Sequence, residues 1–192
     1  MKLAYLFCAL MLSTVTAFAG TTAPRDFATE LYSLKLKDIE GKIVQMNQYK
    51  GKVLMIVNTA SQCGFTPQLK NLTELQSQLG PQGFQILAFP SDDFHQDKGS
   101  NAEVQKFASE NYKINFPLFD KASVKGEQKQ ELYKILTAQR SDLLNEVQWN
   151  FEKFVIDRKG LVIERYRSMT KPDDAKVVEL LKKLLAESPV GK

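Results

Sequence analysis

Three consecutive segments between residues 53 and 89 constrain the fold of this chain more than any other part of it. Residues 53–57 are all apolar, as in a strand buried on both faces, and residues 67–79 carry leucines at helical spacing. Residues 84–89 form a second strand-like run, which Pro90 ends. A strand–helix–strand unit of this length predicts two parallel strands joined by a right-handed crossover.

Cys63 stands where the first of these strands passes into the helix. The positive end of the helix dipole and its free backbone N–H groups favour the thiolate, which is the reactive form of cysteine. Thr66 suits the N-cap of this helix, and Pro67 suits its first position. The string Cys63-Gly64-Phe65-Thr66 has the length of a C-x-x-C motif, but Thr66 replaces the second cysteine. A single nucleophile therefore remains.

Residues 1–19 have the pattern of a signal peptide. Lys2 gives a positive start, residues 3–15 form an apolar run, and residues 17–19 (Ala-Phe-Ala) match the small-x-small cleavage pattern. We expect cleavage after Ala19, export to the periplasm or the medium, and no stable membrane insertion afterwards. Residues 20–192 are then expected to form a single domain. The alternative is an uncleaved membrane anchor, which the short apolar run disfavours.

Export would remove Cys8 and leave Cys63 as the only cysteine. An odd cysteine in an exported protein suggests a reactive thiol or an intermolecular bond, and the alternative is a buried, inert thiol.

Composition and charge exclude several classes of function. The chain has 26 Lys and Arg against 22 Asp and Glu, interspersed along its length, so nucleic-acid binding is not indicated. His95 is the only histidine and Cys63 has no nearby second sulfur, so a metal site and a Cys–His hydrolase are both disfavoured. We expect no metal and no bound cofactor.

The remaining segments complete an α/β pattern. After a polar leader at residues 20–30, the sequence predicts a hairpin at 34–37 and 43–46. It also predicts a helix that begins with a capping box of Ser100 and Glu103, a helix over 126–139 and a last helix that starts near Pro172. A second hairpin at 154–157 and 162–165 is expected to turn between Asp157 and Gly160. This order predicts a thioredoxin-like fold, with a central mixed sheet, helices on both faces and an N-terminal β-hairpin.

Three blocks of sequence, in this order, resemble the glutathione peroxidase family. The first is residues 58–68 around Cys63, Asn-Thr-Ala-Ser-Gln-Cys-Gly-Phe-Thr-Pro-Gln. The second is residues 87–96, Leu-Ala-Phe-Pro-Ser-Asp-Asp-Phe-His-Gln, where the loop is one residue shorter than in the family. The third is residues 149–160, which begin Trp-Asn-Phe-Glu-Lys-Phe. The resemblance covers residues 29–186 and implies an enzyme that reduces hydrogen peroxide or organic hydroperoxides with a thiol.

The resemblance implies a catalytic group of Cys63, Gln96, Trp149 and Asn150. In the family the thiolate attacks one peroxide oxygen and becomes a sulfenic acid, and neutral donors hold the anion. The structural alternatives are a buried core aromatic for Trp149 and a turn residue before a strand for Asn150. The shortened loop makes the position of Gln96 the open question.

Two departures from the family bear on the reductant and on assembly. Ala108 and Ser91 stand where other members carry a second cysteine, so an external thiol, glutathione or a thioredoxin-type protein, is the expected co-substrate. Access for that thiol requires Cys63 to be partly exposed. Only residues 140–148 precede the third block, without the longer insertion of tetrameric members, so we expect a monomer. Two other functions are alternatives: a non-catalytic periplasmic binding or accessory domain, and a thiol–disulfide exchanger, which Thr66 disfavours.

Overall fold

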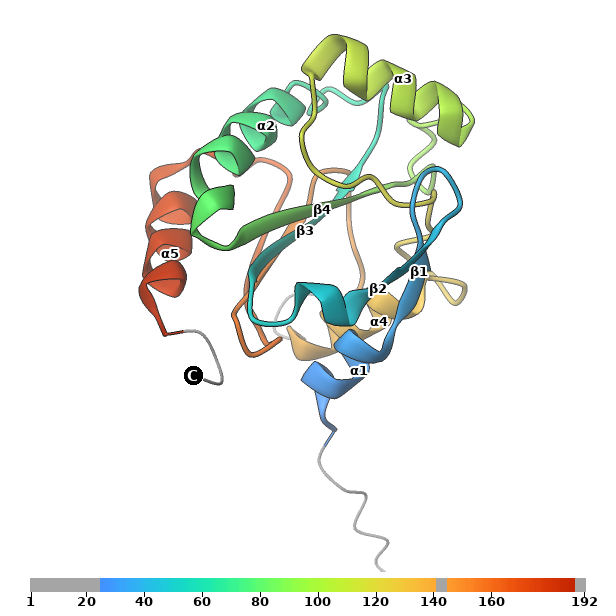
Figure 1. Ribbon diagram of the computed structural model, residues 1–192. Coiled ribbons are helices and arrows are strands. Elements are labelled where there is room, and N and C mark those ends of the chain that lie inside the picture. The colour runs from blue at the N-terminus through green and yellow to red at the C-terminus, as the bar shows by residue number, and fades with distance from the viewer. Residues whose placement is uncertain (1–24, 141–144, 189–192) are drawn as a thin grey trace, which may run out of the picture.

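The computed structural model describes residues 25–140 and 145–188, and the predicted signal peptide lies outside them. A four-stranded sheet in the order β4-β3-β5-β6 forms the centre (Figure 1). β3 (Val53–Thr59) runs parallel to β4 (Phe84–Pro90) and antiparallel to β5 (Lys153–Ile156). β6 (Val162–Tyr166) is antiparallel to β5. The predicted mixed sheet and the parallel β3–β4 pair are therefore confirmed.

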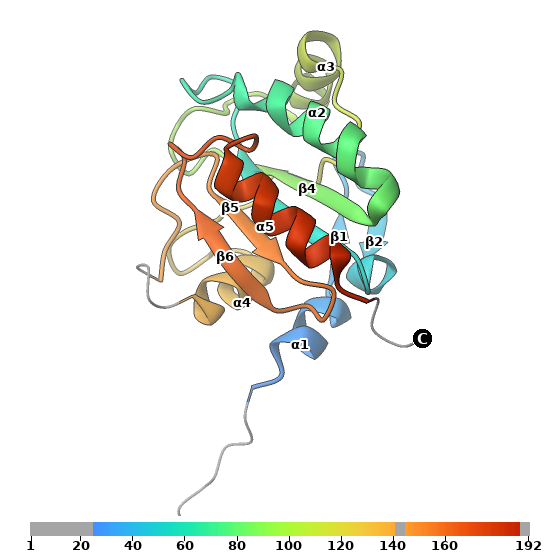
Figure 2. The same ribbon diagram turned by 90° about the vertical axis from the view of Figure 1, so that its left-hand side faces the viewer.

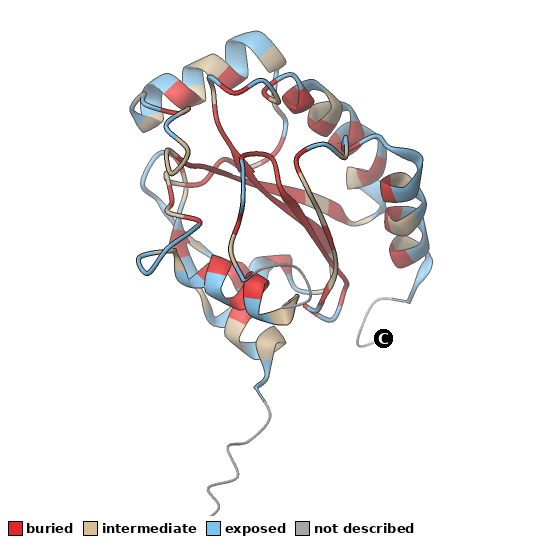
Figure 3. Ribbon diagram, turned by 180° about the vertical axis from the view of Figure 1, so that it is seen from behind, coloured by how far each residue is buried: buried red, intermediate tan, exposed pale blue. Residues whose placement is uncertain are grey.

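Helices cover both faces of this sheet, as predicted. α2 (Gln68–Leu79) and α5 (Ala175–Ala186) lie side by side on one face (Figure 2), where their leucines pack on Met55 and Val57. α1 (Phe27–Ser33) and α4 (Glu131–Gln139) cover the other face, against Leu54 and Ile56. Every residue of β3 is buried, because successive side chains of this central strand point into the two opposite cores (Figure 3). α3 (Asn101–Tyr112) contacts α2 and begins with the predicted capping box.

The N-terminal hairpin forms a separate two-stranded sheet. β1 (Lys35–Lys37) pairs with β2 (Ile43–Gln45), and the Asp38 carboxylate accepts hydrogen bonds from the backbone of Glu40 and Lys42 in the turn. A 3-10 turn, η1 (Met46–Tyr49), follows, and a second, η2 (Gly80–Gln82), ends α2. Isolated bridges join Leu118 to Ala88 of β4 and Phe119 to Asp38, so the apolar segment at 116–119 connects hairpin and sheet.

Some predicted element boundaries differ from the structure, because a side chain or a loop conformation outweighed the apolar pattern. Residues 20–30 are not a polar leader throughout, because Asp26 accepts from the Thr29 N–H at 3.1 Å and starts α1. α4 begins at Glu131 rather than at 126, where Gly126 is left-handed with φ +72°. The last helix, predicted to start near Pro172, begins at Ala175 after its N-cap Asp174.

Among the residues that the structure describes, no helix combines the length and the apolar character needed to cross a membrane.

Candidate active site

Cys63 lies in the loop between β3 and α2, and Thr66 closes this loop around it. The Thr66 hydroxyl donates to the Ala60 carbonyl at 2.8 Å and accepts from the Cys63 N–H at 3.1 Å. The sequence predicted that Thr66 caps the helix, and this prediction was wrong. The cap position is Pro67, without a side-chain hydrogen bond, and α2 starts at Gln68.

The sulfur of Cys63 receives one backbone hydrogen bond. The Phe65 N–H donates to Sγ at 3.4 Å, and a donor in this position stabilises negative charge on sulfur. Only 7% of Cys63 is exposed, so the expected partial exposure was wrong. A molecule larger than water therefore reaches the sulfur only if neighbouring groups move.

The loop that carries Gln96 is fastened to the Cys63 loop at two points. The Gln96 carbonyl accepts from the Gln62 N–H at 2.9 Å. The buried Asp97 carboxylate accepts from the Ser61 N–H at 2.9 Å and from its hydroxyl at 2.6 Å. His95 takes a left-handed conformation, φ +58°, just before them. The shortened loop thus keeps Gln96 next to the residue that precedes Cys63.

Asn150 meets Gln96 from the other side of the site. Its Nδ2 donates to Gln96 Oε1 at 3.0 Å, and the residue is fully buried in the turn before β5. Its Oδ1 has no hydrogen-bond partner among the described residues. A buried amide oxygen without a partner leaves an acceptor for a water molecule or a substrate proton.

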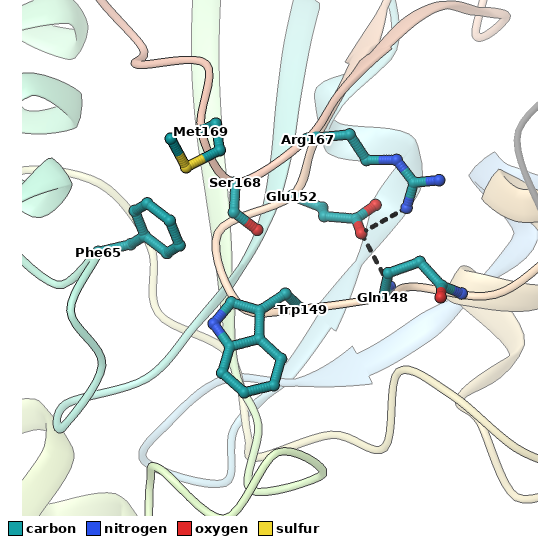
Figure 4. A pocket seen from close by; sticks show the side chains of 7 residues that line it. All are labelled: Phe65, Gln148, Trp149, Glu152, Arg167, Ser168 and Met169. Atoms are coloured by element: carbon teal, nitrogen blue, oxygen red, sulfur yellow. Dashed lines mark hydrogen bonds and ion pairs between the residues drawn. The ribbon is translucent and has the colours of Figure 1, made fainter.

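Trp149 is not a core aromatic, since 41% of it is exposed. Its ring packs on Phe94 at 5.2 Å between centroids, and its carbonyl accepts from Asn58 Nδ2 at 3.0 Å. Trp149 also lines a pocket of about 390 Å³ together with the side chains of Phe65, Gln148, Glu152, Arg167, Ser168 and Met169 (Figure 4). Phe65, two residues after Cys63, is one of the lining residues, and the lining is mostly apolar.

Buried polar residues that the sequence analysis did not single out hold this segment. Asn58 Oδ1 accepts from the Glu152 N–H at 3.0 Å. Phe151, the residue before Glu152, takes a left-handed conformation with φ +62°. The buried Glu152 carboxylate pairs with Arg165 at 2.7 Å and with Arg167 at 2.9 Å. Asn58, a polar residue in an otherwise apolar strand, was the available signal.

The structure therefore brings Gln96 and Asn150 together beside the Cys63 loop and places Trp149 at the adjoining pocket. Direct contact of their side chains with the Cys63 sulfur stays a prediction. Within residues 25–140 and 145–188, no three His, Cys, Asp or Glu side chains gather in a way that could hold a metal ion.

Comparison with known proteins shows the family. The family model for glutathione peroxidase matches residues 31–137. The glutathione peroxidase-like peroxiredoxin HYR1 of Saccharomyces cerevisiae is 43% identical over 162 residues, which cover 83% of this chain and 98% of that protein. The chain belongs to the glutathione peroxidase family. The glutathione peroxidase of Lactococcus lactis is 42% identical over 80% of this chain and 98% of its own length. The hydroperoxy fatty acid reductase gpx1 of Synechocystis is 40% identical over 75% of this chain and 90% of its own length.

Solved structures agree with this membership. The crystal structure of Trgpx in its apo form covers 84% of this chain and 98% of its own, with 34% identity and a TM-score of 0.67. The structure of a thiol:disulfide interchange protein of Chlorobium tepidum covers 80% of this chain and 94% of its own, with a TM-score of 0.62. At 17% identity it shows only that the fold is shared. The predicted thioredoxin-like fold is confirmed, and this member of the glutathione peroxidase family is a thiol-dependent peroxidase.

Proposed function

We propose that Cys63 is the peroxide-reducing nucleophile and that Gln96, Trp149 and Asn150 surround the reacting oxygens. The observation that carries this proposal is the pairing of the Gln96 and Asn150 amides at 3.0 Å, in a loop that is hydrogen-bonded to the residue before Cys63. Uncharged amides suit this role, because they stabilise an anionic sulfur without trapping it in an ion pair.

The proposed oxidation step forms one bond and breaks one. The Cys63 thiolate attacks the nearer peroxide oxygen, the O–O bond breaks, and Cys63 becomes a sulfenic acid. The leaving oxygen takes up a proton from a water molecule in the site, which the solvent restores, and departs as water or as an alcohol. In this proposal Asn150 Oδ1, which has no hydrogen-bond partner among the described residues, and the Gln96 amide nitrogen would hold water or substrate during this step.

An external thiol then reduces the enzyme. The only other cysteine of the chain is Cys8, in the predicted signal peptide, and the buried position 108 is an alanine. A first thiol displaces water from the sulfenic acid to give a mixed disulfide, and a second thiol releases the Cys63 thiolate and a disulfide product. Glutathione or a thioredoxin-type protein would serve as this co-substrate, so no bound cofactor is required.

The pocket beside Cys63 supports organic hydroperoxides among the substrates. Phe65, Trp149 and Met169 give it apolar walls, and Met169 is 79% exposed at its rim. One relative is named a hydroperoxy fatty acid reductase, which fits a pocket of this kind. We further propose that the protein is exported through residues 1–19 and acts as a monomer.

The deciding experiment is peroxide turnover by the full chain carrying Cys8→Ser, in which Cys63 is the only thiol. Adding Cys63→Ser should abolish turnover with glutathione and with thioredoxin alike, while circular dichroism shows the fold intact. Turnover that survives Cys63→Ser would refute the proposed mechanism.

A further inference from the structure

Gln68, the first residue of α2, connects to the turn that carries the catalytic sulfur. Its backbone N–H donates to the Phe65 carbonyl at 2.9 Å, and the Phe65 N–H donates to Cys63 Sγ at 3.4 Å. Its side chain is buried, and the two atoms of its amide have different partners. Oε1 accepts from Lys153 Nζ at 3.0 Å, and Nε2 donates to the Ser168 carbonyl at 2.7 Å.

Ser168 extends this connection to the opposite side of the site. The serine is buried, and its hydroxyl donates to the Asn150 carbonyl at 2.5 Å. Asn150 in turn binds Gln96. Ser168 lies on the wall of the same pocket as Phe65 and Trp149 (Figure 4). A continuous chain of buried polar contacts thus runs from the Cys63 turn through Gln68 and Ser168 to Asn150.

Lys153 and Ser168 together fix which way the Gln68 amide points. The Ser168 carbonyl can only accept and the Lys153 ammonium can only donate, so the amide nitrogen faces Ser168 and the amide oxygen faces Lys153. Lys153 is fully buried at the start of β5, and Gln68 Oε1 is the only hydrogen-bond acceptor that the described residues offer to Nζ.

Burying the charged Lys153 side chain lowers the stability of the fold. Desolvation lowers the pKa of Lys153 from 10.5 to about 7, although the neighbouring Glu152 carboxylate acts in the opposite direction. An apolar side chain of similar length would fill the position without that cost. A buried lysine with a strongly lowered pKa, hydrogen-bonded to a residue of the Cys63 turn, is therefore a candidate for a functional role.

We propose that Gln68 is a positioning residue of the peroxidase site, oriented by Lys153, that holds the Cys63 turn and the Asn150 segment in one fixed arrangement. The inference rests on the proposed function. Peroxide reduction needs the sulfur at one oxygen and a polar group at the other at the same moment, whereas alkylation of the thiol needs the sulfur alone. Loss of the Gln68 amide should therefore slow oxidation more than alkylation.

The test compares Gln68→Met with Gln76→Met, both in the full chain carrying Cys8→Ser. Gln76 is a matched control, since it is a buried glutamine of the same helix whose amide binds the backbone of β4 at Phe84 and Ile86, away from the site. Oxidation by hydrogen peroxide is followed by quenching and intact mass, and alkylation by iodoacetamide is followed in the same way.

We expect Gln68→Met to lower the ratio of the oxidation rate to the alkylation rate about tenfold, because small misplacements of reacting groups carry penalties of this size or larger. Gln76→Met should leave the ratio unchanged. If the two rates of Gln68→Met change in proportion, or if its ratio equals that of Gln76→Met, the positioning role is wrong. If the parent protein is not oxidised by peroxide at Cys63, the proposed function and this inference both fail.

Lys153→Met provides a second route to the same result. It introduces no buried charge, so we expect it to fold even if Gln68→Met does not. The ratio of oxidation rate to alkylation rate should also fall in Lys153→Met. In the double variant Gln68→Met with Lys153→Met this ratio should be no lower than in the more affected single variant, because the two residues act as one unit. Effects that multiply in the double variant would show that Lys153 does not act through Gln68.

Discussion

Replacing Lys153 by methionine should change how the stability of the protein depends on pH. In the folded state Lys153 loses its proton near pH 7, whereas in the unfolded chain it does so near 10.5. Between these values unfolding takes up a proton, so raising the pH stabilises the fold. Below pH 7 the full cost of the buried charge applies, and above 10.5 it is absent.

The size of this effect follows from the two pKa values. One pH unit inside the window is worth up to about 1.4 kcal/mol. Lys153 is half protonated in the folded state at about pH 7, so the change from there to about pH 9 should stabilise the parent protein by about 2 kcal/mol relative to Lys153→Met. The comparison cancels all groups that titrate alike in both proteins.

Urea unfolding at the two pH values measures the difference directly, with the fluorescence of Trp149, the only tryptophan, as the signal. The absolute stability of Lys153→Met is less informative, because removing the charge stabilises the fold while the unpaired Gln68 oxygen destabilises it. A difference between the two proteins that stays constant from pH 7 to pH 9 within about 0.5 kcal/mol would show that Lys153 does not titrate in this window.

Three further predictions concern the site. After one equivalent of peroxide, intact mass should show the Cys8→Ser protein with one added oxygen, or with one added thiol when a small thiol is present, and a loss of two hydrogens would contradict the single-thiol mechanism. Asp97→Ala should lower the free energy of unfolding by about 1–3 kcal/mol, because it leaves the partly buried N–H and hydroxyl of Ser61 without their acceptor. It should also speed alkylation of Cys63, and unchanged alkylation would mean that Asp97 does not hold the loop around Cys63. Arg165→Met should cost about 3–5 kcal/mol in urea unfolding, since it removes a fully buried partner of Glu152, whereas Lys134→Met, at an exposed pair with Glu131, should cost less than about 1 kcal/mol.

The sequence predicted the elements whose apolar residues repeat with a regular period. The unbroken apolar run of β3 and the leucines of α2 act locally, so each could be read from a few neighbouring residues. The starts of α4 and α5 could not, since they depend on the left-handed Gly126 and on the capping carboxylate of Asp174. Thr66 is of a residue type that often caps helices, but its hydroxyl binds the backbone of Ala60 and Cys63 instead.

The sequence pointed to the proposed nucleophile but not to the residues that hold the loops around it. Cys63 was singled out by its place after a buried strand. Asp97 and Gln68 hydrogen-bond partners 36 and 100 residues away in the chain, and no local pattern marks such pairs. The exposure of Trp149 likewise follows from a segment held by Asn58, 91 residues earlier.

The covering of Cys63 has a consequence for the rate of the enzyme cycle. Hydrogen peroxide is small, but a thiol must approach a sulfur that is 7% exposed, between loops fastened through Ser61, Gln62 and Asp97. In the proposed cycle, reduction of Cys63 then requires a transient opening of these loops, and no thiol can react faster than they open. The rate of reduction should rise with thiol concentration only until opening limits it, and the plateau should be the same for every reductant.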